Sequence, residues 1–271
     1  MKKIITMILA ISMLCTCSFS YSSIEHPQTV IQINEFEKCL IDTEAPSNQE
    51  KIIAAQLAYT DAVRNLVKYD REDLIAMGYS NSMVSLVEKF RQNKDYSPSI
   101  AELTSAAPTM TFYCSDFIAS SVGNRTDVTF KWTFKWSSSP AMTRVDLVGA
   151  VWNHSGMSIS QSSFEVTYTN GATYHDDELY DMETKIDEDE QYIVMTFPMD
   201  LDTSIATCKS GKGEFTLHLN ERITSIQIAY GYGHQTIGKL ESITVTYLGG
   251  SLNFGDSYDT LCSDVRTYYV N

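Results

Sequence analysis

The side chains best suited to acid–base or metal chemistry in this sequence are its histidines. They are His26, His154, His175, His218 and His234. None of them forms an H-E-x-x-H or H-x-H pattern, so the sequence does not carry the motif of the common metalloproteases. His154 and His234 stand in turn-like stretches that contain glycine, and loops at one end of a scaffold often carry binding residues. Both are therefore binding candidates, and loop histidines without a role are the alternative.

A dense acidic run over residues 176–190 is the second feature with chemical potential. Calcium prefers clustered oxygen ligands, and Asp187-Glu188-Asp189 imitates the start of a calcium-binding loop. The match stops there, because Tyr192 stands at the sixth position, where glycine is expected, and Pro198 at the twelfth, where glutamate is expected. Asp187 and Asp189 are the candidate Ca²⁺ ligands, and a solvated acidic loop between strands is the favoured alternative.

Aromatic side chains offer a third kind of chemistry, because their faces bind the apolar C–H surfaces of sugars. Tyr230 and Tyr232 stand beside glycines and close to His234, an arrangement that suits a stacking platform. Trp132 and Trp136 lie on the apolar side of an alternating run and are interpreted as core residues.

Covalent catalysis requires a nucleophile, a base and an orienting group in one place. The chain has no G-x-S-x-G elbow, and Ser210-Gly211-Lys212-Gly213 does not match a phosphate-binding loop. The sequence therefore assigns no catalytic residue.

The first 22 residues read as a secretory signal peptide. Lys2 and Lys3 form a positive end, residues 4–14 are mostly apolar, and small residues follow, with cleavage expected after Ser20 or Ser22. The apolar run is shorter than the ~20 residues that a membrane-spanning helix needs. A membrane anchor and lipid attachment at a leader cysteine are the alternatives. We expect a secreted, extracellular protein.

Acidic residues outnumber basic ones by 34 to 20, which gives a net charge of −14. Loss of Lys2 and Lys3 with the leader would make the mature chain more acidic still. Such a surface repels nucleic-acid phosphates and anionic membranes. We expect no nucleic-acid partner, no transmembrane segment after cleavage, and an exterior ligand of unknown identity.

Four cysteines remain after the leader: Cys39, Cys114, Cys208 and Cys262. In an exported chain this even number permits two disulfides, with three alternative pairings. Buried free thiols, which behave as small hydrophobic residues, are the alternative.

Helical patterns are confined to the first part of the chain. Residues 23–46 are polar and are expected to be a poorly structured lead-in, whereas residues 47–95 are predicted to form a small helical unit. Ser47 opens it with an S-x-x-E capping box, Gly78 is expected to end its second helix, and Ser80 to cap the third. One face of the first helix carries Ile52, Tyr59, Val63 and Leu66.

From residue 108 to residue 271 the apolar pattern has a period of two, which predicts a second domain. Alternation is clearest at Val128, Phe130, Trp132, Phe134 and Trp136. Asn170-Gly171 separates two strand-like runs and is typical of a two-residue hairpin. We therefore predict a mainly β protein, an antiparallel β-sandwich of roughly eight to ten strands with a small N-terminal helical unit.

Two stretches resemble a group of uncharacterised secreted proteins of Gram-positive bacteria. The first is Leu74-Ile75-Ala76-Met77-Gly78-Tyr79-Ser80, similar to a helical L-x-x-x-G-[YF]-S segment of that group. The second is Phe134-Lys135-Trp136, then Pro140, then the run from Asp146 to Trp152, similar to F-x-W…P…D-x-[IV]-G-x-x-W. The resemblance implies an exported protein with a β-rich C-terminal domain. It implies no activity.

The sequence leaves three hypotheses about the function. The preferred one is an exported, non-catalytic protein that binds a glycan, a peptide or a protein through loops at one end of the sandwich. The first alternative is a secreted hydrolase acting on wall or host polymers, with catalytic carboxylates far apart in sequence. The second is a membrane-acting, pore-forming toxin, which would need an alternating hairpin able to insert.

Overall fold

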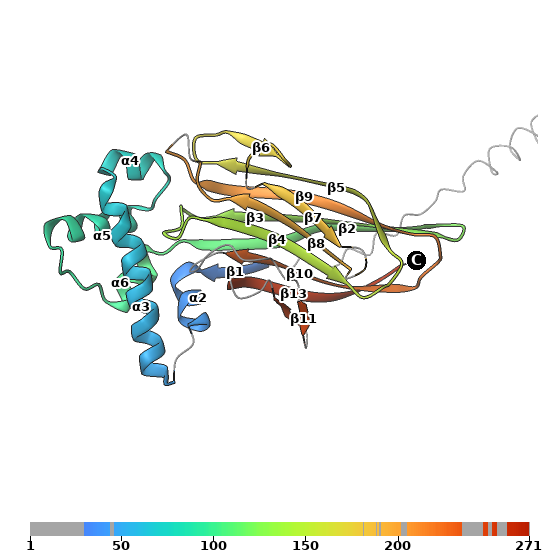
Figure 1. Ribbon diagram of the computed structural model, residues 1–271, viewed down its shortest axis with the longest axis horizontal. Coiled ribbons are helices and arrows are strands. Elements are labelled where there is room, and N and C mark those ends of the chain that lie inside the picture. Colours follow the sequence, from blue (N-terminus) through green and yellow to red (C-terminus); the bar gives the residue numbers. More distant parts are fainter. Residues whose placement is uncertain are drawn as a thin grey trace, which may run out of the picture.

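Two antiparallel sheets packed face to face make up most of the computed structural model (Figure 1). The structure describes residues 30–43, 46–180, 182–187, 189, 191–201, 205–234, 246–248, 251–253 and 259–270. One sheet contains, in spatial order, β1 (Val30–Asn34), β2 (Thr109–Val122), β3 (Arg125–Trp136), β9 (Cys208–Leu219), β5 (Ser158–Tyr168) and β6 (Thr173–His175). The other contains β13 (Asp259–Tyr269), β10 (Ser225–His234), β4 (Val145–Trp152), β8 (Tyr192–Pro198) and β7 (Glu183–Asp187). A small pair is formed by β11 (Thr246–Leu248) and β12 (Ser251–Asn253). The predicted mainly β sandwich with a small helical part is confirmed.

Strand β3 shows why the alternating pattern makes a sandwich. Its five alternating apolar residues are all buried, and the polar residues between them lie on the outer face. Neighbouring glycines on β9 make room for the large rings: a Cβ on Gly213 would lie 2.4 Å from Cζ2 of Trp132. Across the core, the rings of Phe134 and Phe197 stack with centroids 5.0 Å apart, which joins the two sheets.

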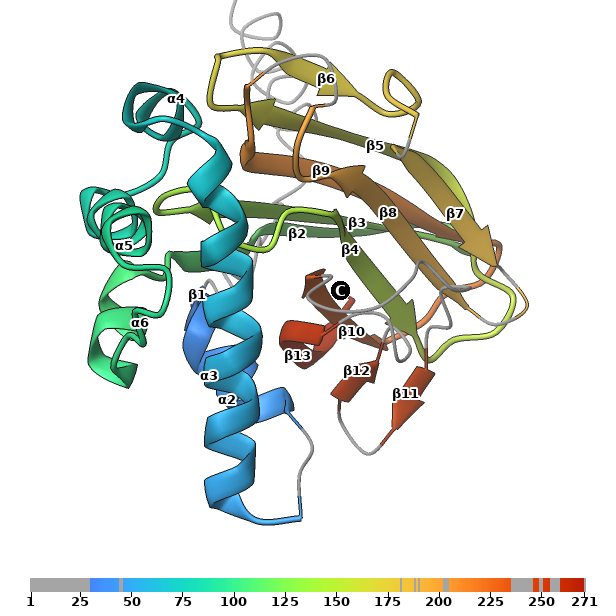
Figure 2. The ribbon, with the colours of Figure 1, turned by 60° about the vertical axis from the view of Figure 1, so that its left-hand side comes forward.

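The helices form a separate unit at one end of the sandwich, as Figure 2 shows. They are α2 (Glu35–Asp42), α3 (Asn48–Asn65), the 3₁₀ turn η1 (Leu66–Lys68), α4 (Arg71–Ala76), α5 (Asn81–Gln92) and α6 (Ile100–Ala106). The predicted caps are present: the Ser47 and Ser80 side chains accept hydrogen bonds from the N–H groups of Glu50 and Met83. Gly78 has the left-handed φ of +88° expected after a helix.

Two expectations about this unit need correction. The spacing predicts that Ile52 shares one helical face with Tyr59, Val63 and Leu66, but Ile52 is 39% exposed, whereas the other three are buried. The unit also extends beyond residue 95, because Ser99 and Glu102 form a capping box that starts α6.

The expected lead-in over residues 23–46 contains regular structure in its described part. Strand β1 pairs with β2 at the edge of the larger sheet, from Val30 opposite Tyr113 to Asn34 opposite Thr109. The Asn34 side chain then caps α2 by accepting hydrogen bonds from the N–H groups of Phe36 and Glu37. This short segment therefore belongs to both parts of the fold, and it places Glu35 at their junction.

The predicted leader lies outside the described residues, as do both of its cysteines. Among the helices that the structure describes, none is long and apolar enough to cross a membrane.

Candidate functional site

The junction between the helical unit and the sandwich is where polar side chains from distant parts of the chain meet. The loop after β3 (residues 137–144), the end of β8 and the end of β10 all reach this end of the sandwich. Strand β1 also ends here, and the chain continues from it directly into α2. Two polar features result, one buried and one open to solvent.

The buried feature is an ionic cluster of Glu35, Asp146 and His234, called here the sealed cluster. All three residues are at most 1% exposed. His234 Nδ1 lies 2.7 Å from Asp146 Oδ1, and its Nε2 lies 3.4 Å from Glu35 Oε1. The first contact is a hydrogen bond, whereas the second is an ion pair without hydrogen-bond geometry. A cation between two carboxylates thus joins α2 to strands β4 and β10.

The surroundings of His234 fix its charge. Burial by itself lowers the pKa of His234, but the charge and hydrogen bond of Asp146, followed by Glu35, outweigh burial and raise this pKa to about 10. His234 is therefore an imidazolium at neutral pH. This charge offsets much of the cost of burying two carboxylates, which would be prohibitive for unpaired ions.

The carboxylate of Glu35 also holds the loop that follows β3. It accepts hydrogen bonds from the main-chain N–H groups of Ala141, at 3.1 Å, and Met142, at 3.0 Å. The hydroxyl of Tyr59 on α3 donates a third, at 2.6 Å. One side chain from the start of α2 therefore fixes the position of both the loop and α3.

A second ring of contacts completes the carboxylate of Asp146. Tyr232 donates its hydroxyl proton to Asp146 Oδ2, and the indole N–H of Trp136 donates to the Tyr232 oxygen at 3.1 Å. Burial and the charge of Asp146 raise the pKa of Tyr232, so its hydroxyl stays protonated and remains a donor. Buried polar groups with this many partners rigidify their surroundings.

The helical unit is also attached through the turn at Gly78. The main-chain N–H of Ser139 donates to the carbonyl of Gly78, and the hydroxyl of Thr207 donates to the carbonyl of Met77. A Cβ on Gly78 would lie 2.6 Å from the Cγ2 of Thr169. Only glycine therefore combines the left-handed backbone with this close approach to the sandwich.

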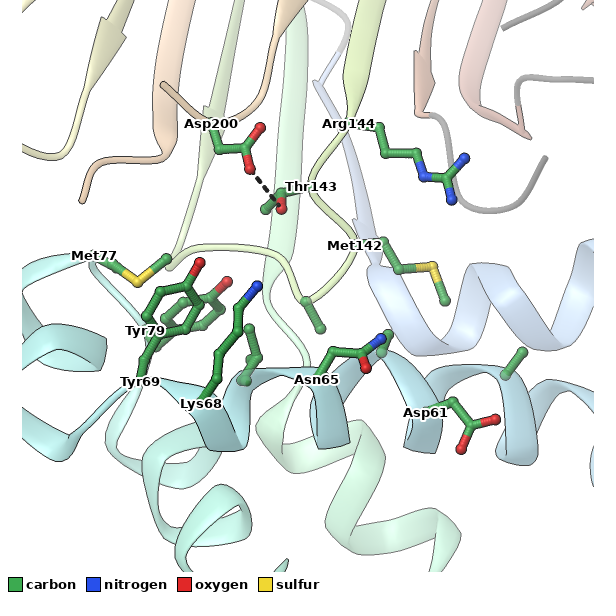
Figure 3. Close-up of a pocket in the computed structure, with 14 residues that line it drawn as sticks. Asp61, Asn65, Lys68, Tyr69, Met77, Tyr79, Met142, Thr143, Arg144 and Asp200 are labelled. Atoms are coloured by element: carbon green, nitrogen blue, oxygen red, sulfur yellow. Dashed lines mark hydrogen bonds between the residues drawn. The ribbon is translucent and has the colours of Figure 1, made fainter. Parts of the chain in front are cut away.

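The open feature is a groove of about 400 Å³ along the same junction, called here the junction groove (Figure 3). One wall is the end of α3 together with η1, and the other is the loop after β3 with Asp200 after β8. Its volume lies within the range of ligand pockets, which often form where two structural units meet. Polar and aromatic side chains line it, among them Asp61, Asn65, Lys68, Tyr69, Tyr79, Thr143, Arg144 and Asp200.

The polar ends of several of these side chains face a common space. Figure 3 shows Lys68, Tyr69 and Tyr79 directed from the helical wall toward the opposite wall, which carries Thr143 in the loop after β3 and Asp200 after β8. The Thr143 hydroxyl donates to Asp200 Oδ2 at 3.5 Å, and the Lys68 ammonium lies 4.8 Å from the centre of the Tyr69 ring. The groove therefore offers hydrogen-bond donors, acceptors and both signs of charge.

Tyr79 is the residue of the groove that packing alone does not explain. It is 5% exposed, and its buried hydroxyl oxygen has no hydrogen-bond partner among the residues that the structure describes. Burial, and then the charges of Glu35 and Asp200, raise the pKa of Tyr79, so the hydroxyl is neutral. A buried hydroxyl without a partner costs about 1–3 kcal/mol, so the fold would be more stable if something bonded to it.

The residues proposed from sequence as an aromatic platform lie inside the protein. Tyr230 and Tyr232 are 1% and 0% exposed and pack against Phe112, and His234 belongs to the sealed cluster. This corrects the expectation of a surface stacking site, because both rings face the space between the sheets. The second half of β10 is buried on both faces, its glycines included.

His154 is not brought together with His234. It follows β4, next to Asn153, whose N–H donates to the carbonyl of Gln227 near the start of β10. His234 ends the same strand, so the two histidines lie at opposite ends of the sandwich. The His154 ring is 3.6 Å from Glu221 at a surface loop.

The candidate calcium ligands do not form a cluster in the part of the chain that the structure describes. Asp187 ends β7 and Asp189 is exposed in the following turn, while Glu188 and Glu190 are outside the described residues. No group of three or more histidine, cysteine or acidic side chains able to hold a metal is found among the residues described.

The cysteines that are described are buried but lie apart. Cys39 belongs to the helical core, whereas Cys114 and Cys208 belong to the core of the sandwich. No disulfide joins any two of these three residues, and burial raises the pKa of the Cys208 thiol. The side chain of Cys262 is outside the described residues.

Sequence reasoning missed the residues that form the junction. Glu35 lies in the segment predicted as a lead-in, and Asp146 stands out in the sequence only as part of a resemblance. One signal was present for Asp146: it is a charge at the start of the buried run Val145–Trp152, where an acid needs a partner. Tyr79 gave no such signal, because only the packing around it shows that its hydroxyl has no partner.

Comparisons with known proteins find only distant similarity. No protein-family model matches the chain, and no curated protein matches it. Among solved structures, it is similar to the collagen-binding domain of a Staphylococcus aureus adhesin, with 10% identity, 56% of this chain and 95% of that chain covered, and a TM-score of 0.32. It is also similar to the collagen-binding subdomain of the Enterococcus faecalis surface protein ACE, with 9% identity, 57% and 95% covered, and a TM-score of 0.30. A third is the C-terminal domain of the Streptococcus agalactiae AgI/II polypeptide BspA, with 7% identity, 54% and 63% covered, and a TM-score of 0.32.

Proposed function

We propose that the chain is an exported, non-catalytic binding protein and that its ligand occupies the junction groove. The observation that carries this proposal is the groove itself, a concave space of about 400 Å³ lined by polar and aromatic side chains from two structural units. The leader-like sequence of residues 1–22 supports export and an extracellular ligand.

The hydrolase alternative needs a reactive histidine or carboxylate that a polymer can reach. Histidine and carboxylates do converge at the sealed cluster, and the pKa of His234 is shifted there, as at many active sites. However, the three side chains are at most 1% exposed, and loop and helix cover them. The cluster therefore supports a structural role in which it holds the loop that forms one wall of the groove.

The pore-forming alternative has no support in the described sheet. Residues 157–174 are a Thr/Ser-rich stretch that could serve as such a hairpin, and they contain β5 and most of β6. Strand β5 is paired with β9 along most of its length, so insertion would break an established ladder.

A charge reversal in the groove tests the proposal. Asp200 is exposed on one wall, so Asp200→Arg changes the charge of the groove without disturbing the core. The control is Asp189→Arg, the same reversal at an exposed turn away from the junction. Purified mature protein is titrated against arrays of glycans, peptides and extracellular proteins.

Saturable binding that is lost in Asp200→Arg and kept in Asp189→Arg is the expected result. Binding that both variants retain would place the ligand elsewhere and contradict the groove. Sequencing the N-terminus of the exported protein tests the leader, with a start at Tyr21 or Ser23 expected.

A further inference from the structure

We propose that the junction groove binds a neutral saccharide, and that the buried hydroxyl of Tyr79 forms a hydrogen bond with it. This inference rests on the proposed function, because it names the ligand class of the same groove.

The walls of the groove suit a ligand that both donates and accepts hydrogen bonds. Asp200 contributes a carboxylate that only accepts, and Lys68 an ammonium that only donates, on facing walls (Figure 3). Asn65 and the hydroxyl of Thr143 do both. A sugar hydroxyl also does both, so a single ring can satisfy the two walls at once.

The apolar parts of the groove suit the C–H faces of a sugar ring. Met77 and Met142 line it, together with the ring of Tyr69, which is only partly buried. Methionine side chains adapt to irregular surfaces, and aromatic rings bind apolar sugar faces. The groove thus combines a small apolar surface with many polar groups.

Charge favours a neutral ligand over an anionic one. The chain carries a net charge of −14, whereas the groove lining itself is balanced, with Asp61 and Asp200 against Lys68 and Arg144. An acidic saccharide or a phosphorylated ligand would approach against this field, which slows association and weakens binding.

An extended peptide is less well suited to this groove. Peptides that add to a sheet form main-chain hydrogen bonds with an exposed strand edge. The residues that line the groove come from α3, η1, the Gly78 turn, the loop after β3 and Asp200, and none of these is an edge strand. Recognition here must therefore depend on side chains.

The hydroxyl of Tyr79 is the second, independent observation that points to a ligand. Tyr79 lines the groove, yet no described residue forms a hydrogen bond with its oxygen. The oxygen itself is covered, so contact with a ligand requires a neighbouring side chain to shift. Lys68 and Met77 line the same wall, and their long unbranched side chains can rotate. A ligand hydroxyl that reaches the oxygen would satisfy it.

The test uses saturation-transfer NMR and calorimetry on the full mature chain. The probes are glucose, galactose, mannose, N-acetylglucosamine and disaccharides of each, with sialyllactose and a pool of decapeptides as comparison probes. The variant is Tyr79→Phe, which removes only the hydroxyl. Its matched control is Tyr180→Phe, because Tyr180 is fully exposed at a turn outside the groove. Asp200→Arg serves as a second groove variant.

We expect a neutral saccharide to bind, with affinity about fivefold to tenfold weaker in Tyr79→Phe, unchanged in Tyr180→Phe and lost in Asp200→Arg. Binding of only peptides or sialyllactose, lost in Asp200→Arg, would overturn the saccharide inference and leave the proposed function standing. Saccharide binding that Tyr79→Phe does not weaken would overturn the role of the hydroxyl. If no probe binds, or if Asp200→Arg has no effect on any bound probe, the inference and the proposed groove fail together.

Discussion

The sealed cluster and the junction groove lie at the same junction, yet their polar groups have opposite surroundings. In the sealed cluster, Glu35 and Asp146 receive several hydrogen bonds and a counter-charge, at almost no exposure. In the groove, the hydroxyl of Tyr79 is also buried but has no hydrogen-bond partner within the described part of the chain. The comparison separates two uses of buried polarity: one holds the two structural units together, and the other leaves a bonding group for something outside the chain.

The largest effect is expected from breaking the sealed cluster. Glu35→Gln removes the negative charge near His234, and its amide nitrogen cannot accept the hydrogen bonds that a carboxylate oxygen accepts. Removing one partner of a buried ion pair costs about 3–5 kcal/mol, and we expect a loss of that size in the free energy of unfolding. Urea denaturation measures it.

The matched control is Glu37→Gln, two residues further along the same helix at an exposed position. We expect it to change the free energy of unfolding by less than about 1 kcal/mol. Equal losses in the two variants would show that Glu35 acts only through the helix terminus and that the cluster contributes nothing.

A loss of stability at high pH is the next expectation. The pKa of His234 is raised to about 10 in the folded protein, against about 6.5 in an unfolded chain. The stability that this group contributes is therefore complete below about pH 6.5 and is lost as the pH rises through 10. The groups that face the ring are Asp146, Glu35 and the indole of Trp136.

Denaturation curves between pH 6 and pH 10 measure this loss, and ¹⁵N NMR of the imidazole reports the charge directly. A His234 ring that is neutral at pH 7.5 would contradict the ion pair. The urea-unfolded chain in the same buffer gives the reference titration.

A smaller effect is expected at the Gly78 turn, which attaches the helical unit to the sandwich. Gly78→Ala places a Cβ 2.6 Å from Thr169 Cγ2 and forces alanine into a left-handed backbone. The matched control is Gly171→Ala. Gly171 has a φ of +84°, close to the +88° of Gly78, but nothing lies within 4 Å of a Cβ built at Gly171. We expect about 1–2 kcal/mol of destabilisation in Gly171→Ala and more in Gly78→Ala. Equal shifts in the melting temperatures of the two variants would show that close packing of the Gly78 turn on the sandwich does not contribute to stability.

Local chemistry made much of the fold predictable. Strand β3, the caps at Ser47 and Ser80, and the turn at Gly78 each depend on residues within a few positions of one another. The short segment of β1 and α2 was not predictable in this way. Its strand is at an edge and its helix has eight residues, so pairing with β2 and packing of Phe36 on Tyr59 decide its structure.

The site depends on contacts that no local pattern records. Glu35 lies 107 positions from Met142, and Asp146 lies 88 from His234. The register between β4 and β10, with Leu147 opposite Gly233, brings the second pair together. The buried positions of Tyr230 and Tyr232 are hard to predict for a related reason: their neighbouring glycines are typical of a loop, whereas both faces of this part of β10 are covered.

A pair of identical substitutions compares the two regions directly, and one of the two, Tyr79→Phe, is expected to have the smallest effect of all. Tyr59→Phe removes a hydroxyl that donates to Glu35 at 2.6 Å, and a hydrogen bond to a charged group is worth about 1.5–3 kcal/mol. Tyr79→Phe removes a hydroxyl of similar burial that has no partner, so we expect no loss in the free energy of unfolding, or a small gain. Urea denaturation without ligand should therefore show a lower free energy of unfolding in Tyr59→Phe, and an unchanged or slightly higher one in Tyr79→Phe. If Tyr79→Phe destabilises as much as Tyr59→Phe, its hydroxyl already has a partner within the fold, and the contrast between sealed cluster and groove disappears.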